Sequence, residues 1–204
     1  EYTLVSVADY ILECAEAEGI GDLVTVSNLS SSRALRDVTE AHGGKYYASA
    51  VGEVNVTTLM REKGAIIGGE GNGGVIYPAI HAGRDAMVGV ALFLSNLAHK
   101  KMKVSALKKT YPEYHIAKNR IELSDKSLID KILNRLQEIF ADQDVNTVDG
   151  VKISFEDKRE WVHLRKSNTE PIIRIYSEAK TVERAVALGN EVIEVARGII
   201  NEGA

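Results

Sequence analysis

Apolar and polar positions along residues 1–100 predict helices and strands in turn. Apolar side chains recur at helical spacing in some segments, and short apolar runs bounded by glycine or polar residues indicate strands in others. The expected order is helix 4–17, strand 23–26, helix 31–42, strand 45–49, helix 54–62, strand 65–67 and helix 85–97. Strands that alternate with helices are typical of a mostly parallel sheet with right-handed crossovers, which holds ligands at the carboxyl ends of its strands. We therefore predict a three-layer α/β/α domain in which helix 85–97, apolar nearly all round, is buried against the sheet.

The order of elements changes in the second half of the chain. We expect strand 115–123, helix 127–140, strands 150–155, 161–165 and 172–176, and helix 182–200. Three successive strands between two helices indicate an α+β domain, with helices packed on one face of a largely antiparallel sheet. Thr181 is expected to cap the closing helix, whereas Asp142 and Asp144 are expected in a solvated turn.

Length and composition support a globular protein of two domains. The 204 residues, 45% hydrophobic and 26% charged, exceed the usual span of about 150 residues for one domain. Pro112 lies in a polar stretch and ends any helix before it, so we expect domains at 1–110 and 111–204. A formal net charge of −4 argues against a nucleic acid or an anionic membrane as the main partner.

Cysteine content and apolar runs bear on the compartment. Cys14 is the single cysteine, so the chain has no internal disulfide, which suits a reducing cytoplasm. The longest apolar run, 86–94, is far shorter than the roughly 20 residues of a membrane helix, and the first residues lack a signal-peptide pattern. The histidines are scattered without ligand spacing, so we expect no metal site within these residues. We therefore expect a cytoplasmic protein.

A short polar segment between two predicted strands has the chemistry to bind a phosphate. Its side chains supply a guanidinium, two hydroxyls and an amide, from Arg165, Ser167, Asn168 and Thr169. A phosphate binds such charged donors together with the backbone N–H groups of a turn. Arg174, which alternates with apolar residues on the next strand, either supports this segment or lies on a solvated sheet face. Taken alone, the composition also fits an ordinary solvated turn, so the hypothesis needs a second motif.

The glycine-rich segment 68–74 supplies that motif. It contains the spacing G-x-G-x-x-G of a dinucleotide site, but Pro78 follows closely where such a site needs a helix, and the lysine of a phosphate-binding P-loop is absent. Glu70 would repel a phosphate, whereas its carboxylate suits sugar hydroxyls, and Asn72 can donate and accept beside it. A flexible turn with an incidental glutamate is the alternative.

Together the two segments resemble the α-D-phosphohexomutases, the family of phosphoglucomutase, phosphomannomutase and phosphoglucosamine mutase. Relatives carry G-E-x-[SN]-G in the third domain and R-x-S-[GN]-T-x-P in the last, and both stand here in that order. Gly83-Arg84-Asp85 is similar to the G-x-D-G start of a long helix in the family, with Ala86 in place of the second glycine. The resemblance implies that Glu70 and Asn72 read the sugar, while Arg165, Ser167, Asn168 and Thr169 hold the phosphate.

Two motifs of the family do not occur in these residues. They are the phosphoserine loop, similar to T-A-S-H-N-P, and the magnesium loop, similar to D-G-D-x-D-R. We therefore interpret the chain as the C-terminal half of a mutase, with no catalytic residue of its own and inactive alone. The resemblance implies Mg²⁺, a hexose 1,6-bisphosphate activator and the N-terminal domains as partners in the intact enzyme. A free-standing phosphosugar-binding module is the alternative, and the preferred hexose stays open.

Overall fold

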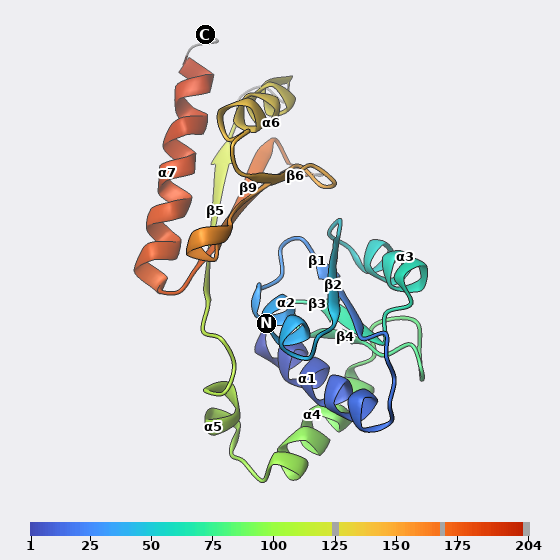
Figure 1. Ribbon diagram of the computed structural model, residues 1–204. Helices are drawn as coiled ribbons and strands as arrows, with labels where there is room; N and C mark the ends of the chain where they lie inside the picture. The colour runs from blue at the N-terminus through green and yellow to red at the C-terminus, as the bar shows by residue number, and fades with distance from the viewer. Residues whose placement is uncertain (124–126, 168–169, 202–204) are drawn as a thin grey trace. The chain divides into compact units, whose positions relative to one another are not determined.

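The structure is a computed structural model that describes residues 1–123, 127–167 and 170–201 (Figure 1). Contacts within the chain divide it into two compact units, Glu1–Glu113 and Tyr114–Ala204. Each unit contains one β-sheet. Among the helices of the described residues, none has the length and hydropathy to cross a membrane.

The first unit is a sheet of four strands between two layers of helices. Its elements are α1 (Tyr2–Ala17), β1 (Val24–Asn28), α2 (Ala34–Ala41), β2 (Lys45–Ser49), α3 (Glu53–Lys63), β3 (Ile67–Glu70), β4 (Gly74–Ile76), α4 (Ala86–Lys100) and α5 (Val104–Lys108). The strand order is β2-β1-β3-β4, in which β1 pairs parallel with β2 and β3, and β4 is antiparallel to β3. Helix α3 packs on the sheet opposite the layer formed by α1, α2 and α4 (Figure 1). The predicted three-layer domain with a mostly parallel sheet is confirmed.

The central strand and α3 show why this layering is stable. Every residue of β1 is buried, as expected for a parallel strand covered on both faces. Its Val24 and Val26 belong to a core cluster with Val56 and Met60 of α3 and Ile76 of β4. Apolar side chains of three sequence-distant elements therefore bury one another on this side of the sheet.

Helix α4 is not buried as predicted. Asp85 caps its start, because the carboxylate accepts N–H groups of the first turn at 2.9 and 3.0 Å. Along the helix only Gly89 and Asn96 are buried, whereas Met87 is 79% and Leu94 57% exposed. The 15-residue helix packs on α1 and on β4, an edge strand of three residues that is too short to cover it.

The second unit is a five-stranded antiparallel sheet packed with helices. Its elements are β5 (His115–Glu122), α6 (Ser127–Ile139), β6 (Asp144–Asn146), β7 (Val151–Phe155), the 3₁₀ turn η1 (Glu156–Lys158), β8 (Glu160–Lys166), β9 (Ile172–Ala179) and α7 (Val182–Asn201). The strand order is β5-β9-β8-β7-β6. Thr181 caps α7 as predicted, since its hydroxyl accepts the backbone N–H of Arg184 at 3.1 Å.

Alternation along these strands decides which side chains face the helices. Ile121, Leu164, Ile173 and Ile175 form one core cluster with apolar residues of α6 and α7. Successive side chains of a strand point to opposite faces, so the residues between these positions lie on the other face of the sheet. The predicted packing of helices on one face of an antiparallel sheet is confirmed.

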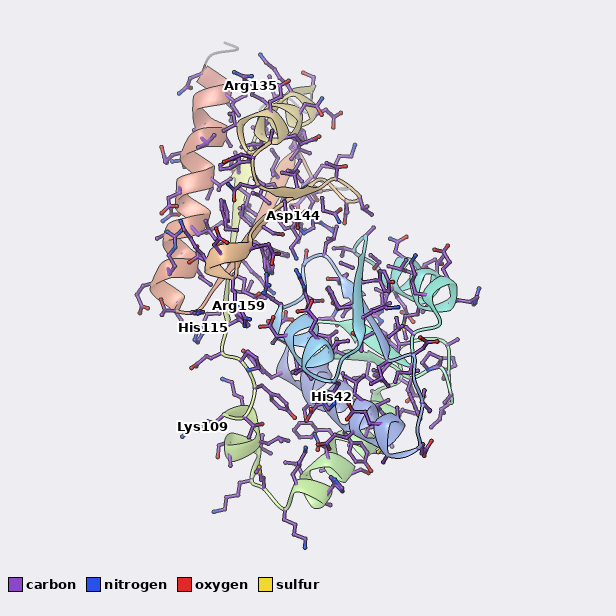
Figure 2. The ribbon with its side chains drawn as sticks, in the orientation of Figure 1. His42, Lys109, His115, Arg135, Asp144 and Arg159 are labelled. Carbon is purple, nitrogen blue, oxygen red and sulfur yellow. The ribbon has the colours of Figure 1, made fainter. Side chains whose placement is uncertain are left out.

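One strand of this sheet was not predicted. Asp144, expected in a solvated turn, instead begins β6 and pairs with Ser154 of β7 (Figure 2). The segment Asp144–Asn146 has only three residues, and only Val145 is apolar. Its strand conformation depends on pairing with β7, which a local sequence pattern does not reveal.

Candidate functional site

The glycine-rich segment is a β-hairpin rather than the predicted loop. Glu70 ends β3 and pairs with Gly74 of β4, so the connecting turn comprises only residues 71–73. At Gly69, with φ of 153°, a Cβ atom would lie 2.0 Å from the carbonyl oxygen of Gly74. The two strands therefore approach each other only because position 69 is glycine. Glycine disfavours strands locally, which explains why the pattern predicted a loop.

The carboxylate of Glu70 is buried and held by two donors. Its side chain lies at the carboxyl end of β3, and the residue is only 5% exposed. Asn28, at the carboxyl end of the neighbouring β1, donates its amide N–H to Oε1 at 2.8 Å. A guanidinium nitrogen of Arg84 lies 3.4 Å from Oε2. A carboxylate has about four acceptor positions, so these contacts leave acceptor capacity for hydroxyl groups.

Arg84 also binds a second carboxylate, that of Glu53. Its Nε donates to Glu53 Oε2 at 2.8 Å, and its backbone N–H donates to Oε1 at 2.9 Å. Both hydrogen bonds lower the pKa of Glu53, and the backbone hydrogen bond contributes more than the side-chain one. Glu53 begins α3 and follows the turn at the end of β2. Arg84 thus connects groups at the carboxyl ends of two strands.

The turn that carries Asn72 is tied to the end of β1. Ser31 donates its hydroxyl to Oδ1 of Asn28 at 2.9 Å and accepts the backbone N–H of Gly71 at 2.9 Å. Asn72 itself is exposed, and its Oδ1 accepts the backbone N–H of Gly74 at 3.0 Å. Asn72 is therefore two residues from Glu70 on an anchored turn, with its amide group toward solvent-accessible space.

In the second unit, three arginines form one row across adjacent strands. Arg165 of β8 lies opposite Arg174 of β9, which in turn lies opposite Arg120 of β5. All three alternate with core residues, so they lie on the face opposite α6 and α7. Beside them is a groove of about 470 Å³ whose lining includes Arg120, Arg174 and Glu170. This face of the sheet has the charge to attract an anion.

Arg165 is held on one side and has donor capacity on the other. Its Nη1 lies 3.4 Å from Oδ2 of Asp149, and its side chain is 22% exposed. Its Nε is buried and has no hydrogen-bond partner among the described residues. A buried donor without a partner is rare in folded proteins and often marks a place for a ligand or water.

The structure places two of the four predicted phosphate ligands. The side chain of Arg165 lies on the sheet face opposite α6 and α7. Ser167 donates its backbone N–H to the carbonyl of Ile172 at 3.0 Å, which joins the ends of β8 and β9. Asn168 and Thr169 lie outside the described residues. Within the described ranges, no group of three or more His, Cys, Asp or Glu side chains comes together in a way that could hold a metal ion.

Comparison with known sequences decides the family. Residues 1–114 match the sequence family described as phosphoglucomutase/phosphomannomutase, alpha/beta/alpha domain III, and residues 120–195 match the C-terminal domain of the same enzymes. The chain belongs to the phosphoglucomutase/phosphomannomutase family. The resemblance drawn from the two motifs is therefore confirmed.

Individual members of the family match nearly the whole chain. A phosphoglucomutase/phosphomannomutase from Thermococcus kodakarensis is 36% identical over 199 residues, which cover 95% of this chain and 42% of the relative. A probable phosphoglucosamine mutase from Methanopyrus kandleri is 33% identical over 190 residues, covering 92% of this chain and 41% of the relative. The chain therefore spans about two fifths of the length of these relatives.

A solved structure of the family shares the fold. The N-acetylphosphoglucosamine mutase of Aspergillus fumigatus, in complex with GlcNAc-6P and magnesium, superposes with a TM-score of 0.70 at 16% identity. The match covers 97% of this chain and 43% of that protein.

The motifs did not reveal all the residues around Glu70 and Arg165. Asn28 comes two residues after the predicted strand 23–26. A polar side chain at the carboxyl end of a buried parallel strand is the feature that could have identified it. Arg84 stood in the family motif that begins α4, but no contact with Glu70 followed from that motif. Asp149 gave no signal, because its contact with Arg165 spans 16 residues and depends on the pairing of β7 with β8.

Proposed function

We propose that the intact protein is a phosphohexomutase that interconverts hexose or hexosamine 1-phosphate and 6-phosphate, and that these residues are its substrate-recognition part. The row formed by Arg165, Arg174 and Arg120 carries this proposal. Like charges directly opposite each other destabilise a sheet. Asp149, Glu170 and Glu122 offset part of this repulsion through ion pairs, and a bound phosphate would offset it further.

Recognition is divided between the two units. In the first, Glu70 and Asn72 accept and donate hydrogen bonds to sugar hydroxyls, and Asn28 with Arg84 fixes the orientation of the Glu70 carboxylate. In the second, Arg165, Ser167, Asn168 and Thr169 bind the phosphate. Glu70 is the last residue of β3, and Arg165 lies one residue before the end of β8, so the sheets provide a rigid scaffold that orients both side chains.

Arg174 belongs to the same phosphate site. The sequence left its role open between support of the phosphate segment and a solvated face. Its position opposite Arg165 favours the first role, because two guanidinium groups on neighbouring strands can bind one phosphate from two sides. Its contact with Glu170, at 3.7 Å and largely exposed, is weak enough to exchange for a phosphate.

We infer that Mg²⁺ and a hexose 1,6-bisphosphate activator take part in the reaction of the intact enzyme. The A. fumigatus relative was solved with magnesium and a hexosamine phosphate, which supports both the metal and the substrate class for the family. The described residues offer no cluster suited to a metal ion, so we assign the metal to none of them.

Binding and turnover measured separately test the proposal. The 204-residue chain should bind glucose 1-phosphate, observed as chemical-shift changes at Glu70 and Arg165, yet convert none of it to glucose 6-phosphate. The full-length protein should interconvert the 1-phosphate and 6-phosphate of at least one of glucose, mannose and glucosamine. Turnover by the 204-residue chain, in a preparation free of host mutase, would refute a role in recognition alone. Binding without turnover of any of the three sugars by the full-length protein would favour a phosphosugar-binding module instead.

A further inference from the structure

We propose that Asp149 is a positioning residue, which orients the guanidinium of Arg165 for the substrate phosphate. This inference rests on the proposed function, since it assumes that Arg165 binds the phosphate. Asp149 lies in the turn between β6 and β7, and its Oδ2 is 3.4 Å from Nη1 of Arg165. The contact engages one guanidinium nitrogen and leaves the Nε of Arg165 without a partner in the described part of the chain.

The turn that carries Asp149 is rigidly built against β8. His163 donates its Nε2–H to the carbonyl oxygen of Asp149 at 2.6 Å, since a carbonyl only accepts. Gly150 has φ of 76°, and a Cβ atom there would lie 2.2 Å from the carbonyl oxygen of Leu164. The turn therefore depends on glycine at 150 and contacts the residues on either side of Leu164.

His163 can anchor this turn without opposing Arg165. It is fully buried, and burial lowers its pKa to about 4, so the imidazole is neutral near pH 7. A neutral anchor adds no positive charge beside a guanidinium that must attract an anion. The hydrogen bond from His163 and the close packing at Gly150 thus hold Asp149 in place, and Asp149 in turn orients Arg165.

The Asp149–Arg165 pair differs from an ordinary surface ion pair. The side chains of Arg165 and Asp149 are 22% and 28% exposed, whereas those of Arg197 and Glu194 on α7 are 62% and 68% exposed. Side chains that are mostly withdrawn from solvent lose less orientation to thermal motion and screening. Arg197 and Glu194 therefore provide a matched control pair in the same unit.

The carboxylate of Asp149 has two effects of opposite sign on the KM for a phosphate-bearing substrate. As a negative charge, Asp149 would weaken phosphate binding, so its neutralisation would lower KM. As an orienting group, it improves the geometry of Arg165, and misplacement of a binding group can cost orders of magnitude in rate. The positioning role requires that the second effect exceeds the first.

The test uses steady-state kinetics of the active full-length protein with the sugar 1-phosphate that it turns over best among glucose, mannose and glucosamine 1-phosphate. Asp149→Asn should raise KM roughly tenfold and leave kcat within about threefold. Asp149→Glu keeps the charge but lengthens the side chain, and it should also raise KM. Glu194→Gln should leave both constants unchanged. Partial unfolding of a variant would lower the concentration of active protein, and hence the apparent kcat, without changing KM. A change in KM therefore reports on substrate binding even if the variant is less stable.

A double-mutant cycle separates failure of this inference from failure of the proposed function. In an Arg165→Gln background, Asp149→Asn should no longer raise KM, because the group it positions is gone and only the removal of a negative charge remains. If Arg165→Gln alone leaves KM unchanged, the phosphate site is elsewhere, and the recognition role that the proposed function gives to Arg165 is wrong. If Arg165→Gln raises KM but Asp149→Asn lowers it or leaves it unchanged, only the positioning role is overturned.

Discussion

Arg165 of β8 lies directly opposite Arg174 of β9, so two guanidinium groups share the sheet face opposite α6 and α7. Directly opposed like charges cost stability in an antiparallel sheet. Functional sites commonly retain such unfavourable arrangements because the ligand needs them. At this pair a mutation should therefore weaken binding without a matching loss of stability.

Arg165→Ala in the full-length protein should raise KM for both hexose 1-phosphate and hexose 6-phosphate. Under the proposed function each substrate presents a phosphate to the same site, and loss of the guanidinium should cost roughly 2–4 kcal/mol by analogy with truncating a buried charge pair. Arg165→Lys should recover only part, because an ammonium lacks the planar fork. Kinetics with each substrate separately provides the measurement.

The melting temperature is the control for Arg165→Ala. It should change little, because the substitution removes both the repulsion with Arg174 and the ion pair with Asp149. A rise in KM confined to one of the two substrates would contradict a shared phosphate site.

Glu70→Gln should weaken binding of the sugar phosphate while inorganic phosphate inhibits as before. Glutamine keeps an oxygen that can accept from Asn28 but loses the charge that attracts Arg84, so hydroxyl recognition should lose about 1–3 kcal/mol. The ratio of KM to the inhibition constant of inorganic phosphate measures the difference. Equal weakening of both would place Glu70 in the anion site.

The second unit should lose stability as the pH falls from about 6.5 to about 4. Burial lowers the pKa of His163 from 6.5 to about 4, so the unfolded chain binds a proton in this range that the folded chain does not. Stability contributed by neutral His163 is complete above the unfolded pKa and falls by up to about 3 kcal/mol as the pH approaches the folded pKa. Urea unfolding between pH 7 and pH 4 measures it.

His163→Gln is the control for this pH dependence. Glutamine does not titrate and can still donate a hydrogen bond to the carbonyl of Asp149. The variant should show a shallower loss of stability across the same range. An identical slope in both proteins would assign the loss to carboxylates elsewhere.

Leu94→Ser on α4 should change the stability of the 204-residue chain by no more than about 0.5 kcal/mol, because Leu94 is 57% exposed. Leu12→Ala on α1 provides the contrast. Leu12 is fully buried, so its truncation should cost about 2–5 kcal/mol. Thermal or urea unfolding of both variants tests the exposure of α4, and comparable losses would show that α4 is buried as the sequence pattern predicted.

The sequence by itself determined most of the elements, both fold classes and the resemblance to the family, but not the short elements β4, α5 and β6. Helical and strand periods are local properties, so α1, β2 and α7 could be predicted from the spacing of apolar residues. The motifs at Glu70 and Arg165 are also local, since each places its polar groups within a few residues. These features need no knowledge of which distant segments come together.

Tertiary structure decided which of these groups meet and which faces are covered. The row of Arg165, Arg174 and Arg120 depends on strand register, and the contact of Glu70 with Arg84 depends on where α4 begins beside the sheet. The apolar sequence of α4 predicted burial, but burial requires a surface to pack against, and the short edge strand β4 supplies only part of one. Register and coverage arise from contacts between residues far apart in the chain, so no local pattern encodes them.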